Sequence, residues 1–127
     1  MNSPIVRRRN FPRAPVDSPV QYRTPSGHQY GARTGNISTG GVFLIADDPD
    51  VLPRERIEVA LQLPGLDSPV LARCRVVWIS DRPLFRGSRV YGFGVQFLDL
   101  PDGEFIALAA LVENYCRLWE EGEMPSV

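Results

Sequence analysis

The sequence predicts an all-β fold with one helix: a six-stranded antiparallel β-barrel of the split-barrel kind, followed by a C-terminal α-helix. Two observations support this prediction. Between residues 15 and 98, short apolar segments are separated by turn residues, chiefly Gly and Pro. Residues 101–121 instead repeat apolar side chains every three or four positions, which is the period of an amphipathic helix. Six antiparallel strands with one apolar face commonly close into a barrel, because closure removes exposed edges.

Each predicted strand ends at a turn signal and shows a two-residue alternation of side chains. In the second strand the alternation places Asn36 on the same face as Thr34. In the fifth it places Trp78 on the same face as Cys74, and this apolar face favours the core for both side chains. The predicted strands cover roughly residues 15–23, 28–38, 42–46, 57–63, 70–79 and 90–98.

The chain of 127 residues is long enough for one domain with its own core. Residues 1–13 are rich in Arg and have no regular period, so we expect a flexible arm. Residues 14–121 form the predicted barrel domain, with its helix over about 101–121 and an apolar stripe that includes Phe105 and Leu108. Residues 122–127 are expected to be a disordered tail.

Several classes of protein are excluded by the composition. The sequence shows neither a transmembrane run nor a secretory signal, so we expect a cytoplasmic protein with no membrane insertion. Cys74 and Cys116 lie in apolar surroundings and are expected to be free, buried thiols. With His28 as the only histidine, no metal-ligand spacing, Ser/His/Asp group or Cys/His pair is present, and a P-loop is also missing. We therefore expect no enzyme, metal or cofactor.

The charge of the chain is unevenly distributed. All 14 basic residues are Arg, and the formal net charge is only -1. Residues 1–46 nevertheless carry a net charge of +5, whereas residues 47–127 carry -6. This asymmetry favours a local binding site for one anionic partner and argues against a general nucleic-acid binder, so no DNA or RNA is expected.

The first motif that carries chemistry is an arginine cluster in the arm. Arg8 and Arg9 are adjacent, and Arg13 follows Arg9 by four positions. The planar guanidinium can hold a phosphate or a guanine edge with two hydrogen bonds, and its flat face stacks on a base. Taken alone, such a cluster also fits a solvated tail.

The second motif follows the predicted second strand and contains Asn36, Ser38 and the glycine pair Gly40 and Gly41. An amide can pair with a base edge, and a hydroxyl can donate to a phosphate oxygen. Glycine lets the backbone approach a ligand closely. Taken alone, this segment also fits an ordinary polar turn.

Together, in this order and at this separation, the two motifs resemble the PilZ domain family, a bacterial receptor module for cyclic di-GMP. The family pattern is RxxxR on an N-terminal arm, followed by [D/N]xSxxG on a six-stranded barrel. This sequence supplies Arg9 and Arg13 for the first part, and Asn36, Ser38 and Gly41 for the second. The segment Tyr91–Phe97 also looks like the family's closing strand. The resemblance covers roughly residues 7–119.

The resemblance implies a cyclic di-GMP receptor that signals to an unidentified downstream protein in trans. It implies ligand contacts from Arg8, Arg9 and Arg13, and from Asn36, Ser38 and the Gly40–Gly41 turn. An Arg at position 8 is associated in this family with two ligand molecules per domain. The arm is expected to become ordered when ligand neutralises its charge. The alternative is an adaptor of pilus or motility machinery that acts only through protein contacts, and a homodimer through the C-terminal helix stays open.

Overall fold

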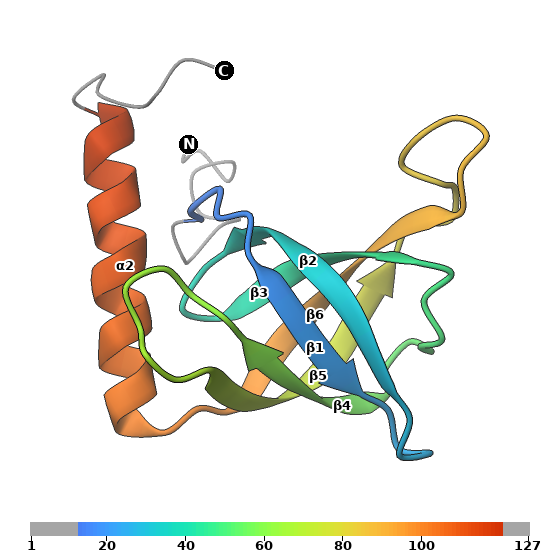
Figure 1. Ribbon diagram of the computed structural model, residues 1–127, viewed down its shortest axis with the longest axis horizontal. Helices are drawn as coiled ribbons and strands as arrows, with labels where there is room; N and C mark the ends of the chain where they lie inside the picture. Colours follow the sequence, from blue (N-terminus) through green and yellow to red (C-terminus); the bar gives the residue numbers. More distant parts are fainter. Residues whose placement is uncertain (1–12, 121–127) are drawn as a thin grey trace, which may run out of the picture.

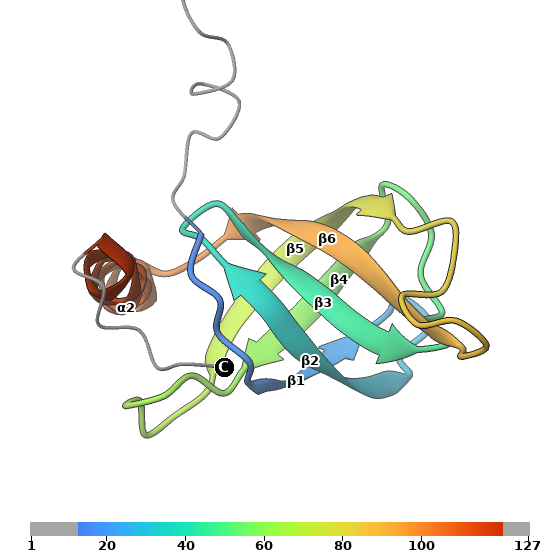
Figure 2. The same ribbon diagram turned by 90° about the horizontal axis from the view of Figure 1, so that it is seen from above.

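In the computed structural model, six strands form a closed antiparallel barrel, as predicted, and their order around it is β1-β2-β3-β6-β5-β4 (Figure 1). The structure describes residues 13–120, and the side chains of residues 13–115. The helix α2 (Asp102–Glu120) lies beside one end of the barrel, and the loop that joins β5 to β6 projects from the other end (Figures 1 and 2). The strands are β1 (Pro19–Arg23), β2 (Gln29–Ile37), β3 (Gly41–Asp47), β4 (Arg56–Leu61), β5 (Val70–Ile79) and β6 (Val90–Asp99).

Most strand boundaries agree with the sequence, but β1 begins later than predicted. Residues 15–18 were expected to be strand, yet β1 starts at Pro19. Before it, Ala14 forms an isolated bridge with Ile37, and the Ser18 amide donates to the Thr34 hydroxyl at 2.9 Å. A side chain therefore replaces a backbone acceptor next to β1, and the regular ladder cannot extend into this segment.

The core fills the inside of the barrel with one face of every strand. Tyr22 and Phe93 meet edge to face at its centre, with ring centroids 5.4 Å apart. Cys74 is fully buried and free, as predicted, whereas the Cys116 side chain lies outside the described residues. The helix adds Leu108 to this core as expected.

One predicted member of the helix stripe does not join the core: Phe105 keeps 46% of its surface exposed. Phe105 lies in the first turn of α2, near the point where the helix leaves the barrel. Leu108 and Val112, one and two turns further on, are the residues that pack. Of the described helices, none is long and apolar enough to cross a membrane.

Three register shifts interrupt the pairing of the strands, and two of them overturn a prediction. The pairing of β2 with β3 shifts between Thr34 and Asn36, and the pairing of β5 with β6 shifts between Val76 and Trp78. Each β-bulge adds one residue to its strand, so the side chains beyond it change faces. Trp78 was predicted to lie in the core and is instead 48% exposed. Asn36 was predicted to share a face with Thr34, and the shift separates them.

Candidate functional site

The fold brings the two sequence motifs into contact. Nη1 of Arg13 donates a hydrogen bond to Oδ1 of Asn36 at 2.9 Å, although the two residues are 23 positions apart. Directly after Arg13, Ala14 exchanges two backbone hydrogen bonds with Ile37, of 2.8 and 2.9 Å. The last residue of the arginine motif is therefore fixed beside the first residue of the asparagine motif.

The bulge in β2 determines the direction of Asn36. Thr34 and Ile37 on either side are 1% and 0% exposed, and they fill the barrel interior. Without the extra residue, strict alternation could not place both of them inside. Asn36 pairs in register with Phe43 of β3 and lies with it on the outer face. The bulge thus turns a polar side chain outward without leaving a gap in the core.

Ser38 has a structural role in the turn between β2 and β3. Its hydroxyl is 1% exposed and accepts hydrogen bonds from the backbone amides of Gly40 and Gly41 at 3.1 and 3.2 Å. It also lies 3.3 Å from the Gly41 carbonyl oxygen, to which it donates. The serine therefore fixes the shape of the turn. A direct contact between Ser38 and a ligand stays a prediction.

The two glycines of the motif serve the contact between β3 and β6. A Cβ added at Gly41 would lie 2.1 Å from the Val95 carbonyl oxygen, far inside any allowed contact. The Gly40 carbonyl accepts a hydrogen bond from the Phe97 amide at 2.9 Å. Gly41 is thus required by the close approach of two strands. Whether these glycines also approach a ligand remains a prediction.

Two stacked aromatic side chains, which the sequence did not predict to lie together, are on the outer face beside Asn36. Trp78 stacks on Phe43, with ring centroids 5.4 Å apart and an interplanar angle of 17°. The register continues across four strands from β2 to β5, and we call this set the aromatic row: Asn36, Phe43, Gly94 and Trp78.

Glycines leave the space in which these rings lie. A Cβ at Gly94 would lie 2.4 Å from Nε1 of Trp78, and a Cβ at Gly92 would lie 2.3 Å from Cζ of Phe43. Two glycines so close together within a strand are a sign of a bulge or of close packing. They are also the sequence signal that aromatic side chains lie flat across the strand.

The remaining predicted site residues, Arg8 and Arg9, lie outside the described residues. The described part of the site combines one guanidinium, one carboxamide and an exposed indole. A guanidinium binds phosphate or the acceptors of a guanine, an amide pairs with a base edge, and an indole offers a surface for stacking. This set suits a ligand that contains both phosphate and bases.

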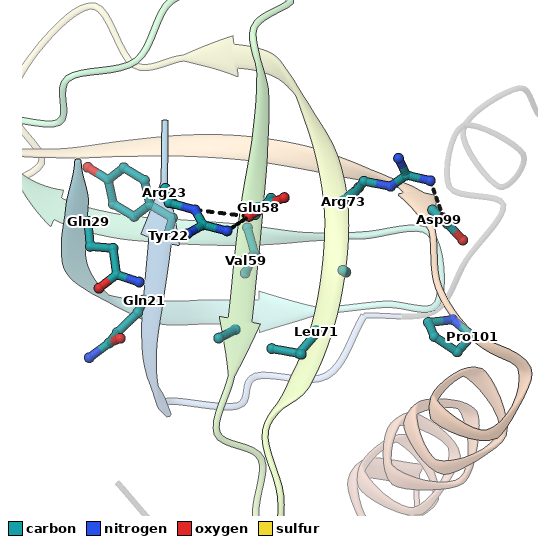
Figure 3. A pocket seen from close by; sticks show the side chains of 12 residues that line it. Gln21, Tyr22, Arg23, Gln29, Glu58, Val59, Leu71, Arg73, Asp99 and Pro101 are labelled. Carbon is teal, nitrogen blue, oxygen red and sulfur yellow. Dashed lines mark hydrogen bonds and ion pairs between the residues drawn. The ribbon is translucent and has the colours of Figure 1, made fainter. Parts of the chain in front are cut away.

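A groove on another part of the outer face offers different chemistry (Figure 3). It encloses about 440 Å³ over β1, β4 and β5. A row of charges crosses it in register, and we call this set the paired row: Arg23, Glu58, Arg73 and Asp99. Arg23 is ion-paired with Glu58 and Arg73 with Asp99, and the hydrogen bond that Arg73 donates to Asp99 raises the pKa of Arg73. Because these charges cancel within the chain, the groove is a poor site for an anion.

Solved structures share this fold at low sequence identity. The PilZ domain of YcgR from Escherichia coli, solved with c-di-GMP, has a TM-score of 0.70 at 16% identity, over 91% of this chain and 96% of that one. The Bacillus subtilis inhibitor of motility (MotI/DgrA) has a TM-score of 0.73 at 18% identity, over 88% of this chain and 52% of that one. The complex of K. pneumonia MrkH with c-di-GMP gives 0.73 at 16%, over 88% and 53%. The chain thus spans about half the length of the last two proteins.

No curated protein matches the sequence. The family model of the PilZ domain, in contrast, matches residues 7–114, which include both sequence motifs and all six strands. This match covers most of the chain, and the barrel with its C-terminal helix agrees with it. The chain therefore belongs to the PilZ domain family.

Proposed function

We propose that the chain is a receptor for cyclic di-GMP that binds its ligand on the outer face of the barrel, at the aromatic row and the Arg13–Asn36 contact. The observation that carries the proposal is the 2.9 Å hydrogen bond between Arg13 and Asn36, which unites two motifs distant in sequence. The family assignment and the c-di-GMP bound to the YcgR domain and to MrkH support the choice of ligand. The role is binding without catalysis.

The chemistry of the ligand matches this face. Cyclic di-GMP has two phosphates and two guanines, and it carries two negative charges. Arg13 provides a charged, planar donor group, and Asn36 provides an amide that pairs with a guanine edge. Trp78 provides a stacking surface that is already held in place by Phe43. The turn at Ser38 holds the backbone from which Asn36 projects.

The arm supplies the rest of the proposed site. Arg8 and Arg9 precede the fixed position of Arg13 by only a few residues, so the chain can bring them to the same ligand. Binding orders the arm across the barrel face, because ligand phosphates neutralise three arginines that otherwise repel one another. The ordered arm and the bound ligand then form a new surface, which a partner protein reads in trans.

Calorimetric titration with cyclic di-GMP tests the proposal. The wild-type chain is expected to bind, and Arg13→Ala is expected to lose about 2–4 kcal/mol of binding free energy, as for truncation of a buried charged contact. Arg9→Ala should lose a similar amount, and Asn36→Ala should weaken binding without unfolding the barrel. Arg33→Ala is a matched control, because Arg33 is on β2 but is paired with Asp17. Absence of binding by the wild-type chain would favour an adaptor that acts only through proteins.

A further inference from the structure

The ring of Phe43 on β3 contacts both strands that neighbour β3 in the barrel. On β2, a Cβ added at Gly35 would lie 2.6 Å from Cδ2 of Phe43. On β6, a Cβ added at Gly92 would lie 2.3 Å from Cζ at the far end of the ring. The ring therefore lies across its own strand, and a glycine on each neighbouring strand leaves the space that it fills.

The contact on β2 lies at the β-bulge beside Asn36. The pairing of β2 with β3 shifts between Thr34 and Asn36, and Asn36 pairs with Phe43. Gly35 and Asn36 thus lie opposite the single residue Phe43, which is the arrangement of a bulge. A side chain at position 35 would have to displace either the ring or the bulge. The ring therefore supports the strand geometry that turns the Asn36 amide outward.

The same ring holds the indole of Trp78. The two ring centroids are 5.4 Å apart, and the ring planes differ by 17°. Trp78 is 48% exposed, and within residues 13–115 its Nε1 makes no hydrogen bond. A Cβ at Gly94 would lie 2.4 Å from this Nε1, so the indole lies against the backbone of β6. Packing against Phe43 and Gly94 is therefore what fixes the direction of the indole.

The surroundings of Phe43 keep its ring in place. The Cβ that Gly92 lacks would lie 3.5 Å from Cδ1 of Leu84, so the Leu84 side chain lies beside the far end of the ring. The Leu84 amide donates to the Val90 carbonyl at 2.7 Å, which fixes this part of the β5–β6 loop. Phe43 itself is half-buried, whereas the indole next to it is more open to solvent. An enclosed ring that supports an exposed one is the usual construction of a rigid binding surface.

We propose that Phe43 is a positioning residue for the ligand: it holds the Asn36 amide and the Trp78 indole at the separation that one ligand molecule requires. This inference rests on the proposed function, in which both groups contact the same ligand. It assigns a role to a residue that lies outside both sequence motifs and that acts through its two neighbours. Side chains that are already held in the binding geometry lose less freedom when the ligand binds, and this raises the affinity.

The first test uses the full chain without ligand and follows the Trp78 indole by near-ultraviolet circular dichroism and fluorescence anisotropy. Trp119→Phe leaves Trp78 as the only tryptophan, and the other variants are made in that background. Phe43→Leu is expected to lose most of the tryptophan band and to lower the anisotropy, because the indole can then turn. Gly35→Ala is expected to shift the same signals, although its methyl group is on β2 and the indole is on β5. Gly31→Ala, a β2 variant with open space around its Cβ, is the matched control and should change neither signal.

The second test is calorimetric titration with cyclic di-GMP, in chains that keep both tryptophans. Phe43→Leu and Gly35→Ala are each expected to bind about tenfold more weakly than wild type, because the amide and the indole must then be ordered during binding. Phe97→Leu is the matched control, since it shortens another partly buried phenylalanine, which packs against the core. It should bind like wild type. Thermal unfolding shows that each variant is folded at the temperature of the titration.

The two tests separate this inference from the proposed function. An unchanged Trp78 signal in Phe43→Leu overturns the positioning role, and so does wild-type affinity in that variant. Either result leaves the proposed receptor standing. A signal that changes in Phe43→Leu but not in Gly35→Ala overturns the link to the bulge at Asn36. A wild-type chain that binds no cyclic di-GMP overturns the proposed function, and with it a role of Phe43 toward this ligand, whatever the spectra show.

Discussion

The aromatic row and the paired row both cross four strands of the same barrel, yet they are built in opposite ways. In the paired row each charge has its partner inside the chain, and the one register shift beside it, between Arg73 and Cys74, leaves Arg73 paired with Asp99. In the aromatic row both terminal side chains, Asn36 and Trp78, follow a β-bulge. Arg56 and Arg75, which lie opposite each other on β4 and β5, have no ion pair with an acid among the described residues. The charges of the paired row are thus balanced within the chain, whereas the arginines next to the aromatic row are not.

The difference indicates where this barrel departs from a purely structural design. Regular alternation and paired charges are what stability alone favours. Natural chains depart from such local rules mainly at functional sites. Here two of the three register shifts and an unpaired group of arginines lie on one part of the surface, and the asparagine motif borders it. The predictions below test whether the two surfaces differ in function as they differ in construction.

The largest effect is expected inside the ladder that supports the aromatic row. Gly41→Ala should destabilise the fold by about 3 kcal/mol, because the new methyl group meets a backbone oxygen that cannot move aside. Thermal unfolding followed by circular dichroism measures the loss. Gly31→Ala is the control, since no atom lies within 4 Å of a Cβ there. Equal melting temperatures for the two variants would contradict the proposed close contact of β3 and β6.

Loss of the indole tests the aromatic row directly. Trp78→Ala should weaken cyclic di-GMP binding by about 2 kcal/mol, the middle of the range for one stacked base. The fold should remain intact, because the side chain is already half exposed. Leu71→Ala removes another exposed apolar side chain, from the other surface, and should leave the affinity unchanged. If both variants bind like wild type, the indole is not a stacking surface for the ligand.

Burial of the Cys74 thiol in the barrel interior should make the free energy of unfolding depend on pH. Burial raises the pKa of the Cys74 thiol to about 12, from an ordinary value of 9.0. Above pH 9 the unfolded chain releases this proton while the folded chain keeps it, so stability falls as pH rises towards 12. The slope for this group is at most about 1.4 kcal/mol per pH unit.

Denaturant unfolding at pH 8, 9 and 10 measures this contribution as the difference in slope between wild type and Cys74→Ala. The Tyr22 hydroxyl, whose pKa is raised by burial to about 12, contributes equally to both proteins and cancels. Parallel stability curves for the two proteins would mean that water reaches the thiol in the folded state.

The smallest effect is expected in the paired row. A double-mutant cycle with Arg23→Ala and Glu58→Ala should give a coupling free energy below about 1 kcal/mol, because both side chains are about half exposed and solvent screens them. Urea unfolding at low and high salt measures the coupling and its screening. The affinity for cyclic di-GMP should not change. A clear loss of affinity would remove the functional distinction between the two surfaces.

The barrel could be predicted from the sequence because most of its strands obey a simple period. β5 was predicted to the residue, since Ala72, Cys74 and Val76 alternate with arginines along it. The closed barrel and the helix follow from six short strands and one change of period, whereas the order of the strands around the barrel was not predicted. The largest error was the start of β1, where a Thr34 hydroxyl takes the place of a backbone acceptor, and the other boundaries differ by two residues or fewer.

The candidate site was predicted only in part, for a physical reason. The residues of the site were found through the two motifs. Which side chains lie beside them depends on β-bulges, and the hydropathy pattern does not show where a bulge adds a residue. If strict alternation is assumed beyond a bulge, every following side chain is assigned to the wrong face. Trp78 was therefore placed in the core, and Asn36 beside Thr34. Pairing across strands, which one sequence does not contain, was needed to bring Asn36, Phe43 and Trp78 into one row.

The bridge between Ala14 and Ile37 also sets the length of a tether. Because it anchors the chain at residue 14, Arg9 can lie no further from Arg13 than four residues of extended chain, about 14 Å. In the proposed receptor, a ligand held at Asn36 would therefore meet this arginine at the high effective concentration of a short linker. Shifting the anchor or lengthening the arm would lower that concentration without changing any contact. The affinity of the proposed receptor would thus be adjustable through chain length alone.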